Sequence, residues 1–217
     1  MSNIADHIVR IKEELPSGVK LVAVSKYRPV EELMEAYDAG QRVFGENRPQ
    51  ELSAKYPVMP KDIEWHFIGH LQTNKLKMVL PFASLVQSVD SVHLLEAIEK
   101  WGEQNDKVID ILLELHLGAE ETKHGLTPDE VKSIVANRGD YPHIRIHGLM
   151  GMATNTSDED VIRADFARIS ALKKEIEASW SEFKELSIGM SGDYLIAIEY
   201  GATIVRVGHK IFTVENE

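Results

Sequence analysis

A lysine stands directly after a short apolar run near the amino end of the chain. Lys26 follows Leu21–Ser25, the sequence LVAVS. A lysine at the end of a strand most often points into solvent. The functional alternative is a Schiff-base lysine, because burial and a neighbouring cation lower the pKa of an ammonium group and release a neutral amine that attacks aldehydes. Lys26 is therefore the sharpest candidate for covalent chemistry in this sequence.

Small residues suited to phosphate binding follow two apolar runs near the carboxyl end. Ser191 and Gly192 follow the first of these runs, and Gly208 and His209 follow the second. In barrels of alternating strands and helices, the last two loops often bind phosphate through backbone N–H groups and a helix N-terminus. Ordinary helix capping is the competing interpretation, since Ser191 is a good N-cap and Asp193 would compete with a phosphate for the helix dipole.

The spacing of the histidines does not favour a metal site. His66 and His70 are four residues apart, as are His143 and His147, which would suit a metal ion on a helix. Both pairs lie in or after strand-like runs, where four residues span roughly 13 Å. One ion cannot bridge that distance, so no metal site is predicted.

The elements that must position these residues alternate along the chain. Short apolar runs are followed by helical patterns, and this alternation predicts a parallel sheet with right-handed crossovers. About eight such units close naturally into a (β/α)8 TIM-like barrel, with a doubly wound open sheet as the alternative. We expect one domain over residues 1–217, with an extra helix at 4–15 that plugs or flanks the bottom of the barrel. The eight predicted strands cover residues 21–25, 43–44, 65–68, 85–88, 109–115, 144–149, 186–188 and 204–207.

Composition narrows the class of protein. The chain has 217 residues, 43% of them hydrophobic, which suffices for a sizeable core. Its 24 basic and 35 acidic residues give a net charge of −11, which opposes nucleic acid as the main partner. The absence of cysteine excludes disulfides and thiolate chemistry. No apolar run approaches the roughly 20 residues that cross a bilayer, and no secretory segment is evident. We expect a cytoplasmic protein without membrane contact.

Several long segments together resemble the YggS/PROSC family of pyridoxal 5′-phosphate-binding proteins. The resemblance covers essentially the whole chain in order. It implies a barrel similar to the N-terminal domain of alanine racemase, with pyridoxal phosphate as cofactor. The segments that carry it are AVSKYRPVEEL, FGENRPQE, WHFIGHLQTNK, HGLMGMA, LSIGMSGDYLIAIEYGAT and VRVGHKIF.

The resemblance also implies roles for individual residues. Lys26 matches the Schiff-base lysine, and Arg206 matches an arginine that lies near the pyridine ring or the phosphate. An arginine beside the ring nitrogen would disfavour its protonation and make the ring a weaker electron sink. The positions that surround the phosphate match Ser191, Gly208 and His209, and those that line the pocket match Asn47, His66 and Met150.

The chain departs from the family pattern in three places. The fifth run reads ELHLGAEETKHG where many members have a glutamine–valine–asparagine stretch, so no role is carried over to His116. His209 replaces a small hydroxyl residue, so only its backbone N–H is carried over. The segment after it reads IFT where the family pattern has IFG.

The family implies a carrier of pyridoxal phosphate in vitamin B6 homeostasis, without a dedicated catalytic residue. A racemase of this type needs a second acid/base, supplied in related enzymes by another domain and subunit, and we expect none here. The alternative is a weakly active racemase-like enzyme in which Tyr27, His66 or His209 is the second base. A regulatory partner protein that uses the barrel as a scaffold is a third hypothesis. We expect a monomer, with pyridoxal phosphate-dependent apoenzymes as candidate partners.

Overall fold

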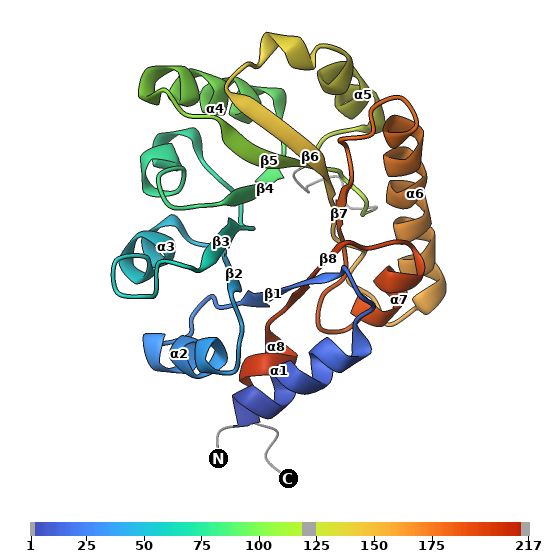
Figure 1. Cartoon of the computed structure of the whole chain (residues 1–217). Coiled ribbons are helices and arrows are strands. Elements are labelled where there is room, and N and C mark those ends of the chain that lie inside the picture. Colours follow the sequence, from blue (N-terminus) through green and yellow to red (C-terminus); the bar gives the residue numbers. More distant parts are fainter. Residues whose placement is uncertain (1–2, 119–124, 214–217) are drawn as a thin grey trace.

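Eight parallel strands form a closed barrel in which each strand pairs with its neighbour in sequence (Figure 1). The structure is a computed structural model that describes residues 3–118 and 125–213. The barrel closes where Lys20–Ala23 of the first strand pair in parallel with Ile204–Val207 of the last. The predicted barrel is thereby confirmed. The strands are β1 (Lys20–Val24), β2 (Val43–Glu46), β3 (Glu64–Phe67), β4 (Leu85–Val89), β5 (Ile109–Glu114), β6 (Ile144–Met150), β7 (Glu185–Ser187) and β8 (Ile204–Val207).

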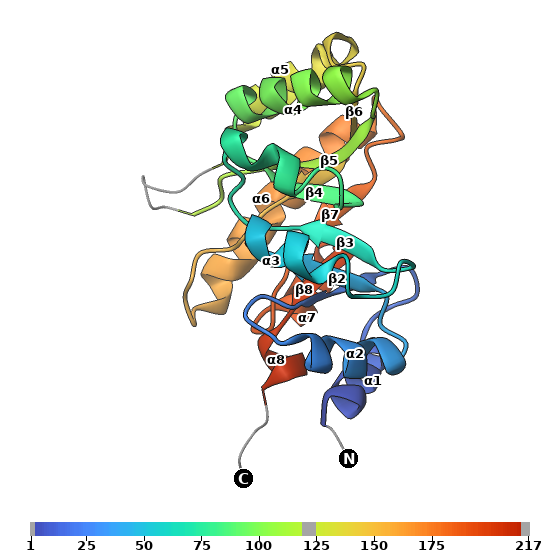
Figure 2. The same ribbon diagram turned by 90° about the vertical axis from the view of Figure 1, so that its left-hand side faces the viewer.

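Helices surround the barrel and cover its outer face (Figures 1 and 2). Residues 72–79, one of the helical patterns that follow the apolar runs, contain the tighter 3₁₀ helix η1 instead of an α-helix. Pro81 disfavours helical geometry at the residue before it, which leaves room only for a short element. The α-helices are α1 (Asn3–Glu14), α2 (Val30–Asp38), α3 (Pro49–Lys55), α4 (Val92–Asn105), α5 (Pro128–Ala136), α6 (Glu159–Glu177), α7 (Tyr194–Glu199) and α8 (His209–Phe212), and the 3₁₀ helices are η1 (Thr73–Met78) and η2 (Arg138–Asp140).

The additional helix α1 flanks the barrel and does not plug it. It lies beside α2 and α8, outside the ring of strands (Figures 1 and 2). Ile4, Ile8 and Ile11 recur at helical spacing and are all buried. Burying this apolar stripe against the neighbouring helices explains why the helix packs on the outer wall.

The interior of the barrel has an apolar layer and, nearer the carboxyl ends of the strands, a polar layer. Successive side chains of a strand point to opposite faces, so residues two apart both point inward. Leu85 and Gln87 of β4 show this change from apolar to polar, as do Ile204 and Arg206 of β8. The apolar layer consists of Val22, Val43, Leu85, Leu112, Met150 and Ile204. The buried polar residues above it are His66, Gln87, Glu114, Ser187 and Arg206.

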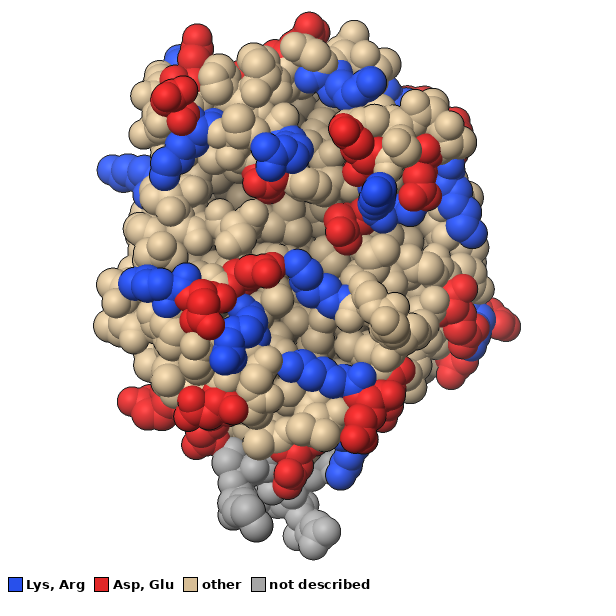
Figure 3. Space-filling view, viewed as in Figure 1, with Lys and Arg blue, Asp and Glu red and all other residues tan. Residues whose placement is uncertain are grey.

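Charges of both signs are interspersed on the end of the barrel that faces the viewer in Figure 3, which shows no continuous basic area. The first residues of β1 and β3 illustrate the pairing, with Lys20 Nζ 2.8 Å from Glu64 Oε2. In the described part of the chain, no helix is both long and apolar enough to span a membrane.

Candidate functional site

Lys26 lies at the carboxyl end of β1, in a tight turn. Its side chain is exposed, whereas Ser25 before it is fully buried. Lys26 and Tyr27 form the turn that follows β1, at the end of the barrel where the strands finish. Tyr27 has a φ of 64°, a left-handed conformation that is uncommon for a residue other than glycine. The turn is thus an unusual backbone conformation that its surroundings must hold in place.

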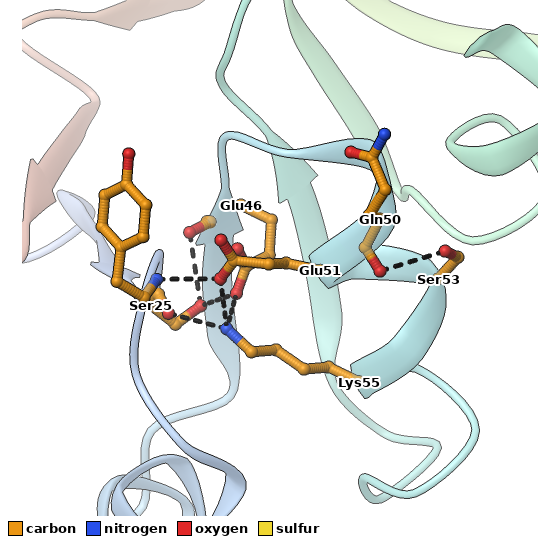
Figure 4. A network of polar contacts seen from close by, with 8 residues as sticks. Ser25, Glu46, Gln50, Glu51, Ser53 and Lys55 are labelled. Carbon is orange, nitrogen blue, oxygen red and sulfur yellow. Dashed lines mark hydrogen bonds and ion pairs between the residues drawn. The ribbon is translucent and has the colours of Figure 1, made fainter.

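A buried network holds the backbone on both sides of Lys26 (Figure 4). Ser25 Oγ donates a 2.7 Å hydrogen bond to Glu46 Oε1, and Lys55 Nζ donates a 2.8 Å hydrogen bond to the carbonyl oxygen of Ser25. On the other side, the N–H of Tyr27 donates to Glu51 Oε2 at 2.8 Å. The residue before Lys26 is therefore anchored to β2 and α3, and the residue after it is anchored to α3.

The centre of this network is a buried ion pair. Lys55 Nζ lies 2.6 Å from Glu46 Oε1 and 3.0 Å from Glu51 Oε2. The side chain of Glu46 is 0% exposed and that of Lys55 is 8% exposed. Burial raises the pKa of Glu46, and the hydrogen bonds from Lys55 and Ser25 oppose this rise. The second carboxylate oxygen of Glu46 is buried without a hydrogen-bond partner among the described residues, so Lys55 is its main source of compensation.

A second polar chain crosses the barrel interior. Gln87 Nε2 donates to His66 Nδ1 at 2.7 Å, and Ser187 Oγ donates to Gln87 Oε1 at 2.6 Å. Arg206 completes the chain, since its NH1 donates to Ser187 Oγ at 2.6 Å and its NH2 donates to the carbonyl oxygen of Gly151 at 2.9 Å. The direction of these bonds makes His66 an acceptor at Nδ1 and assigns its proton to Nε2.

Burial shifts the pKa values of three groups in this interior. It lowers the pKa of His66 to about 3, which keeps the imidazole neutral. It lowers the pKa of Arg206 to about 10, so the guanidinium is charged at neutral pH. Burial and the neighbouring Asp90 raise the pKa of Glu114 to about 7, and Arg206 opposes this rise.

A cavity of about 390 Å³ opens at the carboxyl ends of the strands, within the size range of small-molecule sites. Glu114, Asp90 and His70 give it a polar side, and His70 Nδ1 lies 2.9 Å from Asp90 Oδ2. Asn47 is the one predicted site residue that lines it. The Oδ1 atom of Asn47 is buried and has no hydrogen-bond partner among the described residues.

The loops after β7 and β8 meet at the mouth. The N–H of Gly208 donates a 3.3 Å hydrogen bond to Ser191 Oγ. A Cβ atom at Gly192 would have no heavy atom within 4 Å, so open space adjoins this backbone. Ser191 does not cap α7: the N-cap residue is Asp193, whose Oδ1 accepts a hydrogen bond from the N–H of Met190 at 2.6 Å. The capping interpretation of Ser191 is therefore wrong.

The remaining predicted residues lie away from the cavity. His66 and Met150 are buried in the barrel interior, beneath the mouth. The His209 side chain lines a separate cavity between α1, α7 and α8, and its Nδ1 lies 3.1 Å from Thr213 Oγ1. Only the backbone of His209 adjoins Gly208. The sequence-based expectation for His209 likewise concerned only its backbone N–H.

Sequence reasoning missed Gln87, Ser187 and Glu114 as members of the interior polar layer. A signal was present, because Gln87 and Glu114 interrupt strongly apolar runs, and buried charged or amide side chains are rare without a partner or a function. Lys55 carried no such signal. It resembles an ordinary surface residue of a short helix.

Comparison with known proteins identifies the family. The family model described as alanine racemase, N-terminal domain, matches residues 1–216. The pyridoxal phosphate homeostasis protein of Aquifex aeolicus is 36% identical over 217 residues, which cover 98% of this chain and 95% of that protein. The chain therefore belongs to the family of the alanine racemase N-terminal domain, together with this pyridoxal phosphate homeostasis protein. The resemblance noted in the sequence is confirmed.

Solved structures of other proteins agree with this chain in fold. PipY of Synechococcus elongatus PCC7942, solved with pyridoxal phosphate bound, is 32% identical, covers 97% of this chain and all of that chain, and has a TM-score of 0.89. Alanine racemase of Clostridium difficile 630 is only 11% identical but has a TM-score of 0.84 over 99% of this chain and 57% of that chain. The predicted likeness to the alanine racemase barrel is therefore confirmed at the level of fold.

Proposed function

We propose that this chain binds pyridoxal 5′-phosphate, holds it as a Schiff base on Lys26 and acts as a carrier in vitamin B6 homeostasis. The observation that carries the proposal is the exposed Lys26 amine on a rigidly held turn at the barrel mouth. Its support from the comparisons is the relative PipY, solved with pyridoxal phosphate bound, together with relatives named pyridoxal phosphate homeostasis protein.

The residues at the mouth fit the parts of this cofactor. Lys26 offers a primary amine to the aldehyde. Ser191 Oγ, which accepts from the N–H of Gly208, and the N–H of His209 offer donors to the phosphate beside open space. Asn47 adds an amide with an unpartnered oxygen at the end of β2, the strand next to β1. When bound, pyridoxal phosphate supplies an aldehyde that reacts reversibly with amines.

Arg206, Met150 and His66 complete the proposed site from below. Arg206 stays charged at neutral pH, with a pKa of about 10, and is held by Ser187 and Gly151. Beside the pyridine nitrogen, this cation would disfavour protonation of the ring and weaken its capacity to stabilise a carbanion. Beside the phosphate, it would bind the anion instead. Either position would support binding of the cofactor, and the first would also weaken catalysis with it.

Two of the three candidate second bases of a racemase-like enzyme are poorly placed for that role, which favours the carrier. His66 is 2% exposed, has a pKa of about 3 and accepts a hydrogen bond from Gln87. His209 is directed to the cavity between α1, α7 and α8. Tyr27 is the one of the three that is exposed near Lys26, and its ring lies 4.4 Å from the guanidinium carbon of Arg48.

Borohydride reduction tests the proposed attachment. The protein is loaded with pyridoxal phosphate, reduced and digested, and the modified peptide is identified by mass spectrometry. We expect the label on Lys26, its loss in Lys26→Ala, and full labelling in Lys77→Ala, which removes an exposed lysine of η1. A label on another lysine in the unmodified protein overturns the assignment.

The phosphate contacts and the absence of robust catalysis are tested separately. Ser191→Ala should weaken retention of pyridoxal phosphate during dialysis, and unchanged retention would argue that the phosphate binds elsewhere. Loaded protein incubated with L-alanine in deuterated water should exchange the α-proton no faster than free cofactor does. Exchange at enzyme-like turnover would favour the racemase-like alternative. Delivery to apoenzymes, a monomeric state and a cytoplasmic location belong to the same proposal.

A further inference from the structure

The cavity at the barrel mouth combines apolar walls with one acidic side. Its acidic groups are Glu114 at the end of β5 and Asp90 just after β4. Such a surface suits a ligand with an aliphatic stem and a positive head, because the stem removes apolar wall from water while the head compensates the carboxylates. The apolar walls are formed by Ile68, Leu115, Leu117, Met152, Ala153 and Met190.

Glu114 is a largely buried carboxylate that forms no hydrogen bond within the described residues, although the Arg206 guanidinium acts on it electrostatically. The residue is 7% exposed, and its side chain makes no hydrogen bond or ion pair with any residue that the structure describes. Asp90, by contrast, is bonded to His70. A carboxylate that receives no donor from the protein costs free energy unless a water molecule or a ligand in the cavity supplies the donor. Glu114 therefore points to a ligand in its own right, independently of the acidic character of the cavity.

Asn47 supplies a second acceptor without a partner at the same cavity. Its Oδ1 atom is buried and lacks a hydrogen-bond partner within residues 3–118 and 125–213. An ammonium group has three N–H donors and no acceptor. The acceptors of Asn47, just after β2, and Glu114, at the end of β5, both line this cavity and match the donors of an ammonium group.

We propose that this cavity binds a primary aliphatic ammonium group, whose nitrogen is held by Glu114 and whose methylene stem lies along the apolar walls. The inference rests on the proposed function and deepens it, since Asn47 belongs both to this cavity and to the proposed cofactor site. The ligand class is then the amine that exchanges with the cofactor. The same chemistry occurs in a small alkyl amine and in the side chain of a lysine on another protein.

The charge on Glu114 depends on the groups that face it. Asp90 raises its pKa and Arg206 lowers it, and burial has the largest effect, which places the pKa at about 7. His70 and His116 also line the cavity. Ammonium binding should therefore be tighter at pH 8, where Glu114 is mostly ionised, than at pH 6, where it is mostly protonated.

Calorimetry with n-butylammonium tests the proposal without reliance on cofactor chemistry. The titration uses cofactor-free protein and protein whose bound cofactor has been reduced with borohydride, so that the amine cannot react with an aldehyde. n-Butanol serves as the neutral ligand of matched shape. We expect n-butylammonium to bind at least tenfold more tightly than n-butanol at pH 8, and about tenfold more weakly at pH 6 than at pH 8.

Glu114→Gln is the decisive variant, because it preserves shape and removes the charge. It should weaken n-butylammonium binding at least tenfold and leave n-butanol binding unchanged, whereas Glu103→Gln, an exposed residue of α4, should change neither. Equal affinity of Glu114→Gln and the unmodified protein for n-butylammonium overturns the proposal.

Nα-acetyl-lysinamide distinguishes the two possible sources of the ammonium group. Binding comparable to that of n-butylammonium supports a lysine side chain of another protein, and exclusion supports a small amine. If n-butylammonium does not bind as expected while borohydride still labels Lys26, the proposed ammonium site is refuted and the proposed cofactor attachment is not.

Discussion

Replacement of Lys55 by methionine tests whether the buried ion pair stabilises the turn that carries Lys26. Lys55 Nζ lies 2.6 Å from Glu46 Oε1, 3.0 Å from Glu51 Oε2 and 2.8 Å from the carbonyl oxygen of Ser25. Methionine retains most of the aliphatic volume and removes all three contacts. The substitution therefore isolates the charge and its hydrogen bonds from simple packing.

The expected loss of stability is large because one member of the pair is completely buried. Removal of one partner of a buried ion pair costs about 3–5 kcal/mol, since the remaining charge stays uncompensated. Glu46 fits that case, with a side chain that is 0% exposed and one oxygen that already lacks a partner among the described residues. For a chain of this size such a loss corresponds to a melting temperature lower by roughly 10 °C.

Urea unfolding followed by circular dichroism provides the measurement. Glu46→Gln combined with Lys55→Met should be less destabilised than the sum of the two single variants, because the double variant leaves no buried charge in the pair. Lys132→Met is the matched control, since Lys132 forms an exposed ion pair with Glu175, and its melting temperature should not change. A loss below about 1 kcal/mol in Lys55→Met, or strict additivity in the double variant, would refute the reasoning.

Four further predictions concern the barrel interior. Gly148→Ala should destabilise the protein by about 2–3 kcal/mol or prevent folding, because a Cβ atom there would lie 1.8 Å from the carbonyl oxygen of Glu185; unchanged urea unfolding would contradict the close approach of β6 and β7. The pKa of Glu114 is raised from 4.5 to about 7, so its contribution is fully present below pH 4.5 and declines by about 3 kcal/mol as pH rises to 7; Glu114→Gln should remove this decline from a pH series of unfolding free energies. The pKa of His66 is lowered from 6.5 to about 3, so its contribution is present above pH 6.5 and is lost as pH falls; His66→Asn should flatten the acid limb, and an unaltered limb would count against a buried neutral imidazole. Arg206→Gln should weaken pyridoxal phosphate retention, measured by absorbance after dialysis, and undiminished retention would remove Arg206 from the proposed site.

Local patterns in the sequence were sufficient for the barrel and for several strand ends. Apolar runs such as LVAVS and helical spacing between them report on burial of each element, and eight such units restrict the possible topologies to very few. The position of Lys26 directly after the first run followed from that pattern alone. The helical pattern over residues 72–79 gives only a 3₁₀ helix, because the segment is short and lies next to Pro81, where local propensity is weakest as a guide.

Contacts between side chains from distant elements could not be obtained in this way. Glu46 and Lys55 are nine residues apart, and Gln87 and Ser187 are one hundred residues apart. Each pair meets only because the strands close into a ring with a particular register, and register is a property of all eight strands together.

The sequence by itself determined the order of elements and the residues that stand where strands end, because backbone geometry and apolar spacing act over a few neighbours. The tertiary structure alone decided that Lys55 anchors the turn of Lys26, that His66 is enclosed and that Glu114 faces a cavity without a partner among the described residues. The physical reason is that burial and pairing of a polar group depend on every element packed around it, and no local pattern contains that information.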